Sequence, residues 1–222
     1  MLMASTFWGH FLLFSPHLRR GKNRACELES AARRSPIRSF EGPSGIDWKK
    51  MNQAKATVPK WRLTTTADLK IIDEIADRIH TGLPERSEVF AEKRALFPNG
   101  CLALQIDDRV VGYGFFHPWM IYQIPPLDSF LERVPKTADC LYVHDVVVLP
   151  EYRGHGAVGQ YVKLISDEAS THGLAALALV SVYDTDSMWA KHGFRVVQTN
   201  ALSKKLQSYG PTAKYMASYL NR

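Results

Sequence analysis

Apolar and polar residues follow regular patterns from about residue 58 to the end of the chain. Apolar residues recur at helical spacing in several stretches, which predicts helices at 66–80, 85–96, 157–172 and 187–191. Short apolar runs bounded by turn residues predict strands at 60–64, 101–106, 110–117, 141–149, 175–182, 194–199 and 214–220. The order of these elements indicates an α/β fold.

Two features of this order define the expected sheet. The polar residues 107–109 join two neighbouring strands as a hairpin, and a strand–helix–strand unit follows later in the chain. We therefore expect one mixed, mostly antiparallel sheet with helices on both faces. The connection from 118 to 139 carries four prolines, which predicts a long loop that lies over a site.

The first 57 residues lack this regularity, and we expect an N-terminal extension before a single domain at 58–222. An apolar patch at 7–14 precedes several arginines, and no acidic residue occurs before Glu27. This composition is compatible with a mitochondrial transit peptide. The alternative is a disordered extension, or one that is not translated because Met51 is the start. We expect a cytoplasmic protein, or a mitochondrial one if residues 1–50 are a transit peptide.

The positive charge of the chain is concentrated in this N-terminal part. Residues 1–60 contain 11 Lys and Arg against 4 Asp and Glu, whereas residues 61–222 contain 17 against 18. A nucleic-acid-binding protein is expected to carry its basic residues on the folded surface. We therefore expect no nucleic-acid partner. No apolar stretch is long enough to span a bilayer, and no membrane partner is expected either.

The cysteines and histidines do not indicate a metal or redox site. The three cysteines show no Cys-x-x-Cys spacing, and Cys101 and Cys140 lie in apolar segments where a reduced thiol packs as a small hydrophobe. His117 and His144 fall on separate predicted strands and are able to meet, but no spacing of ligand residues indicates a metal. We expect the two thiols to belong to the core, and the histidines to be either core or hydrogen-bonded residues.

A basic, glycine-bearing turn follows the apolar strand at 141–149. It reads Pro-Glu-Tyr-Arg-Gly-His-Gly-Ala over residues 150–157 and leads directly into the helix at 157–172. Small residues leave backbone N–H groups approachable, and the helix adds the positive end of its dipole. Arg153 adds a full positive charge. The turn is therefore suited to hold phosphates.

Two motifs in order carry a resemblance to a known family. The run from Val148 to Ala157, followed about thirty residues later by Trp-Ala-Lys-His-Gly-Phe at 189–194, resembles the GCN5-related N-acetyltransferase (GNAT) superfamily, including little-characterised bacterial and fungal members. The resemblance covers about 58–220. It implies the acyl-CoA N-acyltransferase fold, acetyl-CoA as cosubstrate, and acetyl transfer to a primary amine by direct attack on the thioester.

The resemblance also implies which residues bind CoA. The turn is expected to hold the CoA diphosphate through backbone N–H groups, and the preceding strand to hold the pantetheine arm. Val158 departs from the family pattern because a small residue is usual there, so the helix start is open to a slight shift. The residues carried over as cofactor-binding are Val146, Val148, Arg153, Gly154, His155, Gly156, Ala157, Val158 and Trp189.

Three residues are candidates for proton transfer. In the family, a residue or a water near the strand before the turn accepts the amine proton, and here the candidates are His144 and Asp145. Strand alternation predicts that only one of the two faces the cleft. The family's usual tyrosine acid aligns with Trp189, whose indole is no comparable acid. Tyr183 is the nearest phenol by sequence, and the alternative is that the thiolate leaves without a protein acid.

The acceptor pocket is expected from the break at 81–87, the loop at 118–139 and the closing strands. Their apolar and aromatic residues favour a small, partly apolar amine over a basic peptide tail, and the protein is expected to be a monomer or homodimer. One alternative is a catalytically degenerate module that binds or senses acyl-CoA. A dinucleotide site is disfavoured because no Gly-x-Gly-x-x-Gly is present.

Overall fold

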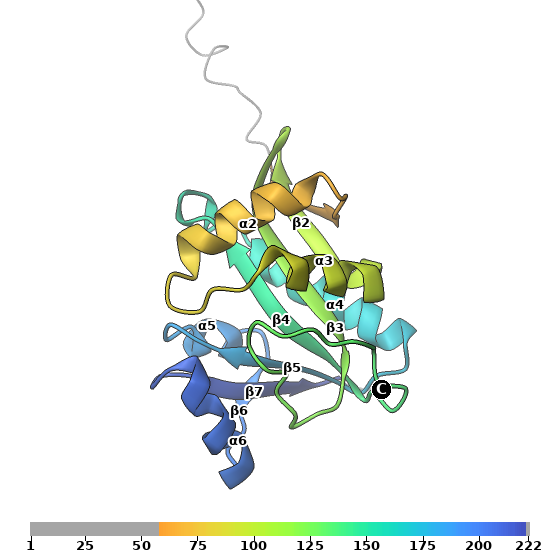
Figure 1. The fold of residues 1–222 in the computed structure, drawn as a ribbon, viewed down its shortest axis with the longest axis vertical. Helices are drawn as coiled ribbons and strands as arrows, with labels where there is room; N and C mark the ends of the chain where they lie inside the picture. The colour runs from red at the N-terminus through yellow and green to blue at the C-terminus, as the bar shows by residue number, and fades with distance from the viewer. Residues whose placement is uncertain (1–57, 221–222) are drawn as a thin grey trace, which may run out of the picture. The chain divides into compact units, whose positions relative to one another are not determined.

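The computed structural model describes residues 58–220 (Figure 1). The N-terminal extension expected at residues 1–57 lies outside the described part. The longer helices are α2 (Asp68–Ile79), α3 (Ser87–Leu96), α4 (Ala157–Thr171), α5 (Asp186–Ala190) and α6 (Asn200–Leu206), with 3-10 turns at Pro98–Gly100, Pro150–Tyr152 and Gln207–Tyr209. The strands are β1 (Lys60–Leu63), β2 (Cys101–Ile106), β3 (Arg109–Trp119), β4 (Cys140–Val148), β5 (Ala176–Ser181), β6 (Arg195–Val196) and β7 (Lys214–Tyr219).

The strands form one seven-stranded sheet in the order β1-β2-β3-β4-β5-β7-β6. Every neighbouring pair is antiparallel except β4 and β5, which run parallel with α4 as their crossover. This arrangement confirms the mixed, mostly antiparallel sheet that the sequence predicts. The single parallel pair places the amino end of α4 beside the carboxyl end of β4.

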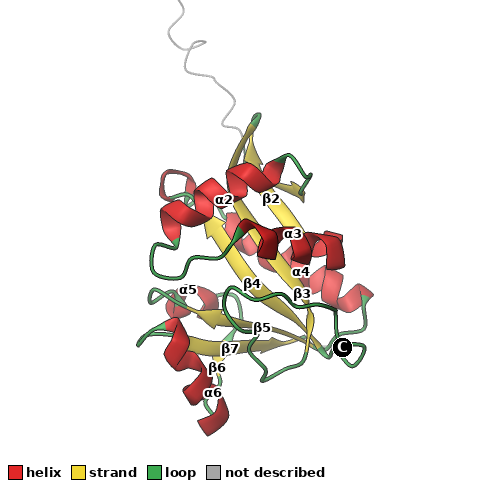
Figure 2. Cartoon of the chain, viewed as in Figure 1, coloured by secondary structure: helices red, strands yellow, loops and turns green. Residues whose placement is uncertain are grey.

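Helices cover both faces of the sheet, as expected (Figure 2). On one face α2 and α3 pack through Ile72 and Phe90 against Tyr113 and Phe115 of β3. On the other face α4 packs through Tyr161 against the central strands. A Cβ at Gly114 of β3 would lie 2.3 Å from the Tyr161 ring. Glycine at that position therefore allows the close approach of α4 to the sheet.

The pairing of β3 and β4 contains an irregularity at His144. Phe115 pairs with Asp145, but the next residue, Phe116, pairs with Val143, so β4 has one extra residue between them. Such a β-bulge breaks the alternation of side chains. His144 and Asp145 consequently point to the same side of the sheet.

The carboxyl-terminal part differs from the predicted elements. The expected strand at 194–199 is reduced to β6, and α6 follows where the sequence predicted no helix. The side-chain oxygen of Thr199 caps α6 by accepting the Leu202 N–H at 3.2 Å, and Leu202 is buried. A seven-residue helix with one buried side chain leaves too little apolar periodicity to be recognised.

The two described cysteines behave as expected. Cys101 and Cys140 are buried and unpaired, and burial raises the pKa of both thiols to about 12. They are therefore inert core residues at neutral pH. Within residues 58–220, no helix has both the length and the apolar character needed to cross a membrane.

Candidate functional site

A cleft opens where β4 and β5 separate. The two strands pair only as far as Val143 and Leu179, and beyond that point β4 stays paired with β3 and β5 with β7 (Figure 1). The cleft has a volume of about 420 Å³. It is lined by Ile79, His80, Leu83, Glu85, Leu127, Tyr142, Val143, His144, Asp145, Val146, Val147, Val148, Arg153, Gly154, Val158, Leu179, Val180, Val182, Tyr183, Thr185, Met188, Trp189 and Tyr209. Its position at the end of parallel strands matches the usual place of ligands in α/β sheets.

One end of the cleft is built from backbone. Gly154 and Gly156 of the turn have φ of +86° and +73°, which is the left-handed region that favours glycine. The first hydrogen bond of α4 runs from the Gln160 N–H to the Gly156 carbonyl at 3.1 Å, so the amides of residues 157–159 precede the helical ladder. The Arg153 Nε donates to the Val148 carbonyl at 2.9 Å, which holds the guanidinium beside the cleft. This end is suited to a diphosphate.

Most of the residues predicted to bind CoA line the cleft. Of the nine, six do so, and they are Val146, Val148, Arg153, Gly154, Val158 and Trp189. The other three do not: His155 and Gly156 are exposed, and Ala157 is buried. Trp189 is only 4% exposed and packs edge-on against Phe194, so most of this side chain belongs to the core. Helix α4 starts at Ala157, and Val158 causes no shift of the expected start.

Asp145 lies at the other end of the cleft with both carboxylate oxygens engaged. Its Oδ1 is 3.0 Å from the Nε2 of His80, the C-cap residue that follows α2, and its Oδ2 accepts the Tyr113 hydroxyl at 2.5 Å. Burial opposes protonation of His80, but the hydrogen bond and charge of Asp145, together with Glu85, raise its pKa. The carboxylate thus holds an imidazole at the cleft wall.

His144 forms a second carboxylate–histidine pair. Its Nε2 lies 2.8 Å from the Oε2 of Glu85, and the side chains of both residues are less than 10% exposed. Burial alone would raise the pKa of Glu85, but the charge and hydrogen bond of His144, with Lys93 and the Asp128 amide, lower it to about 2. The Glu85 carboxylate is therefore ionised at neutral pH.

The expectation that only one of His144 and Asp145 faces the cleft is wrong. Both line it, because the β4 bulge places the two side chains on the same side of the sheet. Their partners come from that side too, since His80 ends α2 and Glu85 lies between α2 and α3. The bulge is defined by the pairing of β4 with β3, and the sequence of β4 alone does not specify this pairing.

Tyr183 lies at the mouth of the cleft, just after β5. It is 49% exposed, and its ring stacks on His80 with 5.8 Å between centroids. Its φ is +54°, a conformation that tyrosine seldom adopts. Partial burial and the charge of Asp145 raise its pKa, so the phenol stays protonated at neutral pH.

Sequence reasoning missed His80 and Glu85 as site residues. Each lies about sixty residues from its partner along the chain, 65 for His80 and 59 for Glu85. The break at 81–87 is the expected pocket wall. His80 next to it and Glu85 within it are the polar residues by which the sequence could have indicated this part of the site. His117 and His144, which the sequence places on separate strands, lie with ring centroids 6.0 Å apart. In the described part of the chain no group of three or more potential ligands could hold a metal ion.

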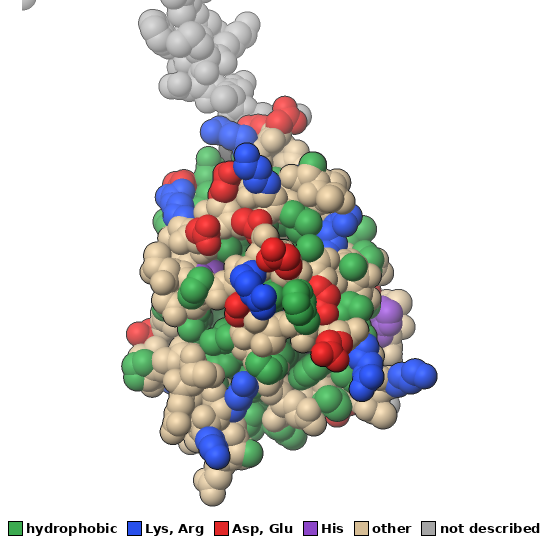
Figure 3. All heavy atoms as spheres, in the orientation of Figure 1, with side chains coloured by type: hydrophobic (Ala, Val, Ile, Leu, Met, Phe, Trp, Pro, Cys, Tyr) green, Lys and Arg blue, Asp and Glu red, His purple; other side chains and the backbone are tan. Residues whose placement is uncertain are grey.

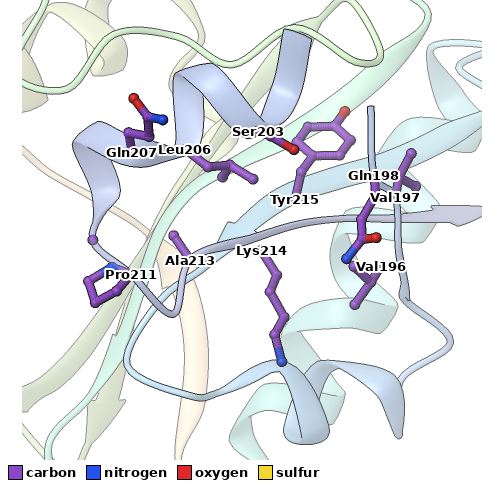
Figure 4. A pocket seen from close by; sticks show the side chains of 11 residues that line it. Val196, Val197, Gln198, Ser203, Leu206, Gln207, Pro211, Ala213, Lys214 and Tyr215 are labelled. Atoms are coloured by element: carbon purple, nitrogen blue, oxygen red, sulfur yellow. The ribbon is translucent and has the colours of Figure 1, made fainter. Parts of the chain in front are cut away.

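A second cavity of about 470 Å³ lies between α6, β6 and β7 (Figure 4). Its described lining residues include no histidine or carboxylate, and its one cation, Lys214, forms an ion pair with Asp186 at 2.7 Å. The described lining of this cavity lacks the carboxylate–histidine pairs that line the cleft between β4 and β5. The candidate active site is therefore the cleft between β4 and β5.

The surface that carries α2 and α3 shows acidic and basic side chains interspersed, without a broad basic stripe (Figure 3). Several of these charges are paired across elements, such as Arg78 with Glu151 and Arg86 with Asp128. Such a surface agrees with the near-neutral charge of residues 61–222.

Solved structures with the same fold include acetyltransferases of different kinds. Ard1 from Thermoplasma volcanium is 12% identical with a TM-score of 0.56, over 74% of this chain and 99% of that one. N-acetylglutamate synthase from Neisseria gonorrhoeae, solved with coenzyme A and N-acetyl-glutamate, is 18% identical with a TM-score of 0.56, over 74% and 35% of the two chains. The ribosomal-protein-S18-alanine N-acetyltransferase from Escherichia coli is 18% identical with a TM-score of 0.52, over 74% and 95%.

At these identities the structural matches show the fold alone, and no curated protein matches the sequence significantly. The family model of the Acetyltransferase (GNAT) family matches residues 69–194, which is more than half of the chain. The match spans every element from α2 to the start of β6 and includes both ends of the cleft. The chain therefore belongs to the acetyltransferase (GNAT) family and is an N-acetyltransferase with acetyl-CoA as its cosubstrate.

Proposed function

We propose that this enzyme transfers the acetyl group of acetyl-CoA to a small primary amine, by direct attack of the amine on the thioester. The observation that carries the proposal is the two-ended cleft. A phosphate-binding helix start lies at one end, and a buried carboxylate–histidine pair lies at the other. Direct attack needs no nucleophile from the protein, and the described cysteines are inert.

His144 is the proposed general base. With its Nε2–H donated to Glu85, the unprotonated Nδ1 is left to accept a proton, and no hydrogen-bond partner for Nδ1 is found among the described residues. The amine nitrogen attacks the carbonyl carbon, its proton passes to Nδ1 directly or through one water, and the carbon–sulfur bond then breaks. Glu85 fixes the tautomer and orientation of the ring.

Asp145 is proposed to position rather than to accept the proton. Both of its oxygens already accept hydrogen bonds, from His80 and from Tyr113. A carboxylate with both oxygens engaged offers no free oxygen to the amine proton. Its role is to hold His80 as part of the cleft wall.

The thiolate of CoA takes up a proton after it leaves. Tyr183 is the proposed donor, because its raised pKa keeps the phenol protonated and its half-exposed side chain lines the cleft. Trp189 packs in the core and is no alternative donor. The backbone of β4 at Val146 and Val148 is proposed to hold the pantetheine arm and the thioester carbonyl.

The experiment measures acetyl-CoA binding and amine-dependent CoA release by the full-length chain. Calorimetric titration establishes binding, and a thiol reagent detects free CoA when a panel of primary amines is added. The proposal predicts binding, and CoA release that depends on the amine and is lost in His144→Gln. Binding without thiol release for any amine would instead identify a degenerate acyl-CoA-binding module.

A further inference from the structure

The acceptor end of the cleft is bordered by carboxylates and apolar side chains. Glu85 and Asp145 line it, together with Ile79, Leu83 and Leu127. The two carboxylates are not free to bind a second cationic group, because each is hydrogen-bonded to a histidine. The remaining lining is therefore an apolar wall with two carboxylate–histidine pairs.

Cations are scarce at this end. Among the described residues that line the cleft, Arg153 is the one lysine or arginine, and it is bound to the Val148 carbonyl at the CoA end. Protonated His80 or His144 would carry a positive charge, but each would share it with Asp145 or Glu85. Neither histidine leaves a net positive charge for a ligand.

Two further cations lie near this end, but neither lines the cleft. Arg86 pairs with Asp128 through its Nε at 2.9 Å and lies on the outer surface. Lys93 is 2% exposed, its Nζ has no hydrogen-bond partner among the described residues, and its charge acts on Glu85 from behind the cleft wall. A carboxylate on the acceptor would thus lie beside two carboxylates and meet no lysine or arginine in the described lining of this end. Removing such a charge from water without a partner is strongly unfavourable.

Two loops close the acceptor end. The backbone N–H of Asp128 donates to the Oε1 of Glu85 at 3.0 Å, and the N–H of Leu131 donates to the Oε2 of Glu92 at 2.8 Å. These bonds fasten the loop between β3 and β4 to the segment that carries α3, and Figure 1 shows this green loop passing across the sheet. Leu83 and Leu127, one from each side, line the cleft there. The space favours a small acceptor.

On the basis of the proposed function, we propose that the acceptor is a primary amine with an apolar or aromatic body and without a carboxylate. Free α-amino acids are excluded by charge rather than by size. The walls from Ile79, Leu83 and Leu127 bury the apolar body. The amine then lies near the Glu85–His144 pair, which receives its proton.

Matched acceptors test this proposal with the full-length enzyme. The pairs are 2-phenylethylamine with phenylalanine, 3-methylbutylamine with leucine, and tyramine with tyrosine, and each pair differs by one carboxylate. We expect kcat/KM for the amine to exceed that for its amino acid by about 100-fold or more. The amino group of an amino acid is a weaker base than that of the matching amine, so a larger fraction of the amino acid is unprotonated at a given pH. A preference for the amine therefore cannot result from its protonation state.

Phenylalaninamide separates charge from bulk, because it carries an uncharged group where phenylalanine carries the carboxylate. The proposal predicts that phenylalaninamide is acetylated within about 10-fold of 2-phenylethylamine. If the amide is rejected as strongly as phenylalanine, size decides and the proposal is wrong. A peptide amide that is acetylated better than every monoamine would also overturn it.

A charge introduced into the apolar wall provides the complementary test. Leu83→Arg places a guanidinium beside the acceptor, and Leu83→Gln is the matched uncharged control. We expect the arginine variant to raise the rate with phenylalanine relative to 2-phenylethylamine by about 10-fold, and the glutamine variant to leave the ratio unchanged. Equal ratios in both variants would contradict the proposal.

The outcomes also separate this proposal from the function on which it rests. If acetyl-CoA does not bind, or if no amine or amino acid releases CoA, the proposed function itself fails. If CoA is released with amino acids as fast as with their amines, the function stands and the exclusion of carboxylates is overturned. If acetyl-CoA binds and only amino acids are acetylated, the charge argument is likewise refuted.

Discussion

The two ends of the cleft are built by different means. The end proposed to bind CoA consists of a turn and a helix start within six consecutive residues, 153–158, and its proposed donors are backbone amides. The acceptor end consists of side chains from α2, β3, β4 and the loop after α2, joined by hydrogen bonds over 32 to 65 residues of sequence. A site of backbone groups within a few consecutive residues can be recognised from a sequence motif. A network of side chains that are far apart in the sequence forms only when the chain folds.

The largest effect that distinguishes the two ends of the cleft is expected for His144→Gln, which removes the proposed base. We expect kcat to fall by about 100-fold or more, since general base catalysis contributes on the order of 10²–10⁴-fold. Acetyl-CoA affinity should stay unchanged, because the CoA end is independent of this side chain. Steady-state kinetics and calorimetry measure the two quantities.

Two further variants accompany His144→Gln: one changes the hydrogen-bond partner of the proposed base, and the other is a control outside the cleft. Glu85→Gln keeps the size but removes the charge that orients the ring, and kcat should fall by about 10-fold. His172→Gln changes a histidine at the end of α4, outside the cleft, and should leave kcat unaltered. A His144→Gln enzyme with the kcat of the parent would refute the assignment of the base.

Gly156→Asp tests the CoA end in the same way. The new carboxylate would stand at the helix start, where the diphosphate is expected, and we predict that the affinity for acetyl-CoA falls by about 100-fold or more. Gly156→Asn is the matched control, because asparagine tolerates the positive φ and carries no charge. It should weaken binding by less than about 10-fold. Equal losses in the two variants would show that backbone strain, not charge, is responsible.

His117 tests whether acid destabilises the acceptor end. Burial and the neighbouring His144 lower the pKa of His117 to about 3. Between its ordinary pKa of 6.5 and about 3, the unfolded chain binds a proton at this histidine that the folded chain does not. The contribution of His117 to the free energy of unfolding is therefore constant above pH 6.5 and decreases as the pH is lowered towards 3. At pH 4 the loss is on the order of 3 kcal/mol.

The substitution His117→Phe should remove this loss. We expect the free energy of unfolding of the variant to change less than that of the parent between pH 7 and pH 4, as measured by urea denaturation at both values. His172→Gln, an exposed histidine, should keep the pH dependence of the parent. If His117→Phe also keeps it, the buried histidine is not the source of acid sensitivity.

Tyr183→Phe has the smallest expected effect. Loss of the proposed proton donor should lower kcat by about 10-fold, because the CoA thiol is fairly acidic and can leave without a protein acid. The ring still stacks on His80, so KM should change little. A decrease that appears in KM alone would assign Tyr183 to the cleft wall rather than to proton transfer.

Most of the fold could be predicted from the sequence because its elements are marked locally. The hairpin at 107–109, the helix after the glycine turn and the strands on both sides all occur where predicted. Helix α6 and the short β6 were missed because little apolar periodicity marks them. At the site, Arg153 and Gly154 were found through their motif, but His80 and Glu85 were not, and the bulge that turns His144 towards Glu85 depends on pairing with β3.

The most direct test of the account is a crystal structure of the enzyme with a bisubstrate conjugate, in which CoA is linked through an acetyl group to 2-phenylethylamine. We predict that the diphosphate lies on the amides of residues 153–158 and that the conjugate's amide nitrogen lies within about 3 Å of a His144 ring nitrogen, or one water away. The phenyl ring should contact Leu83 and Leu127. A diphosphate bound elsewhere, or an amide nitrogen out of reach of His144, would contradict the account.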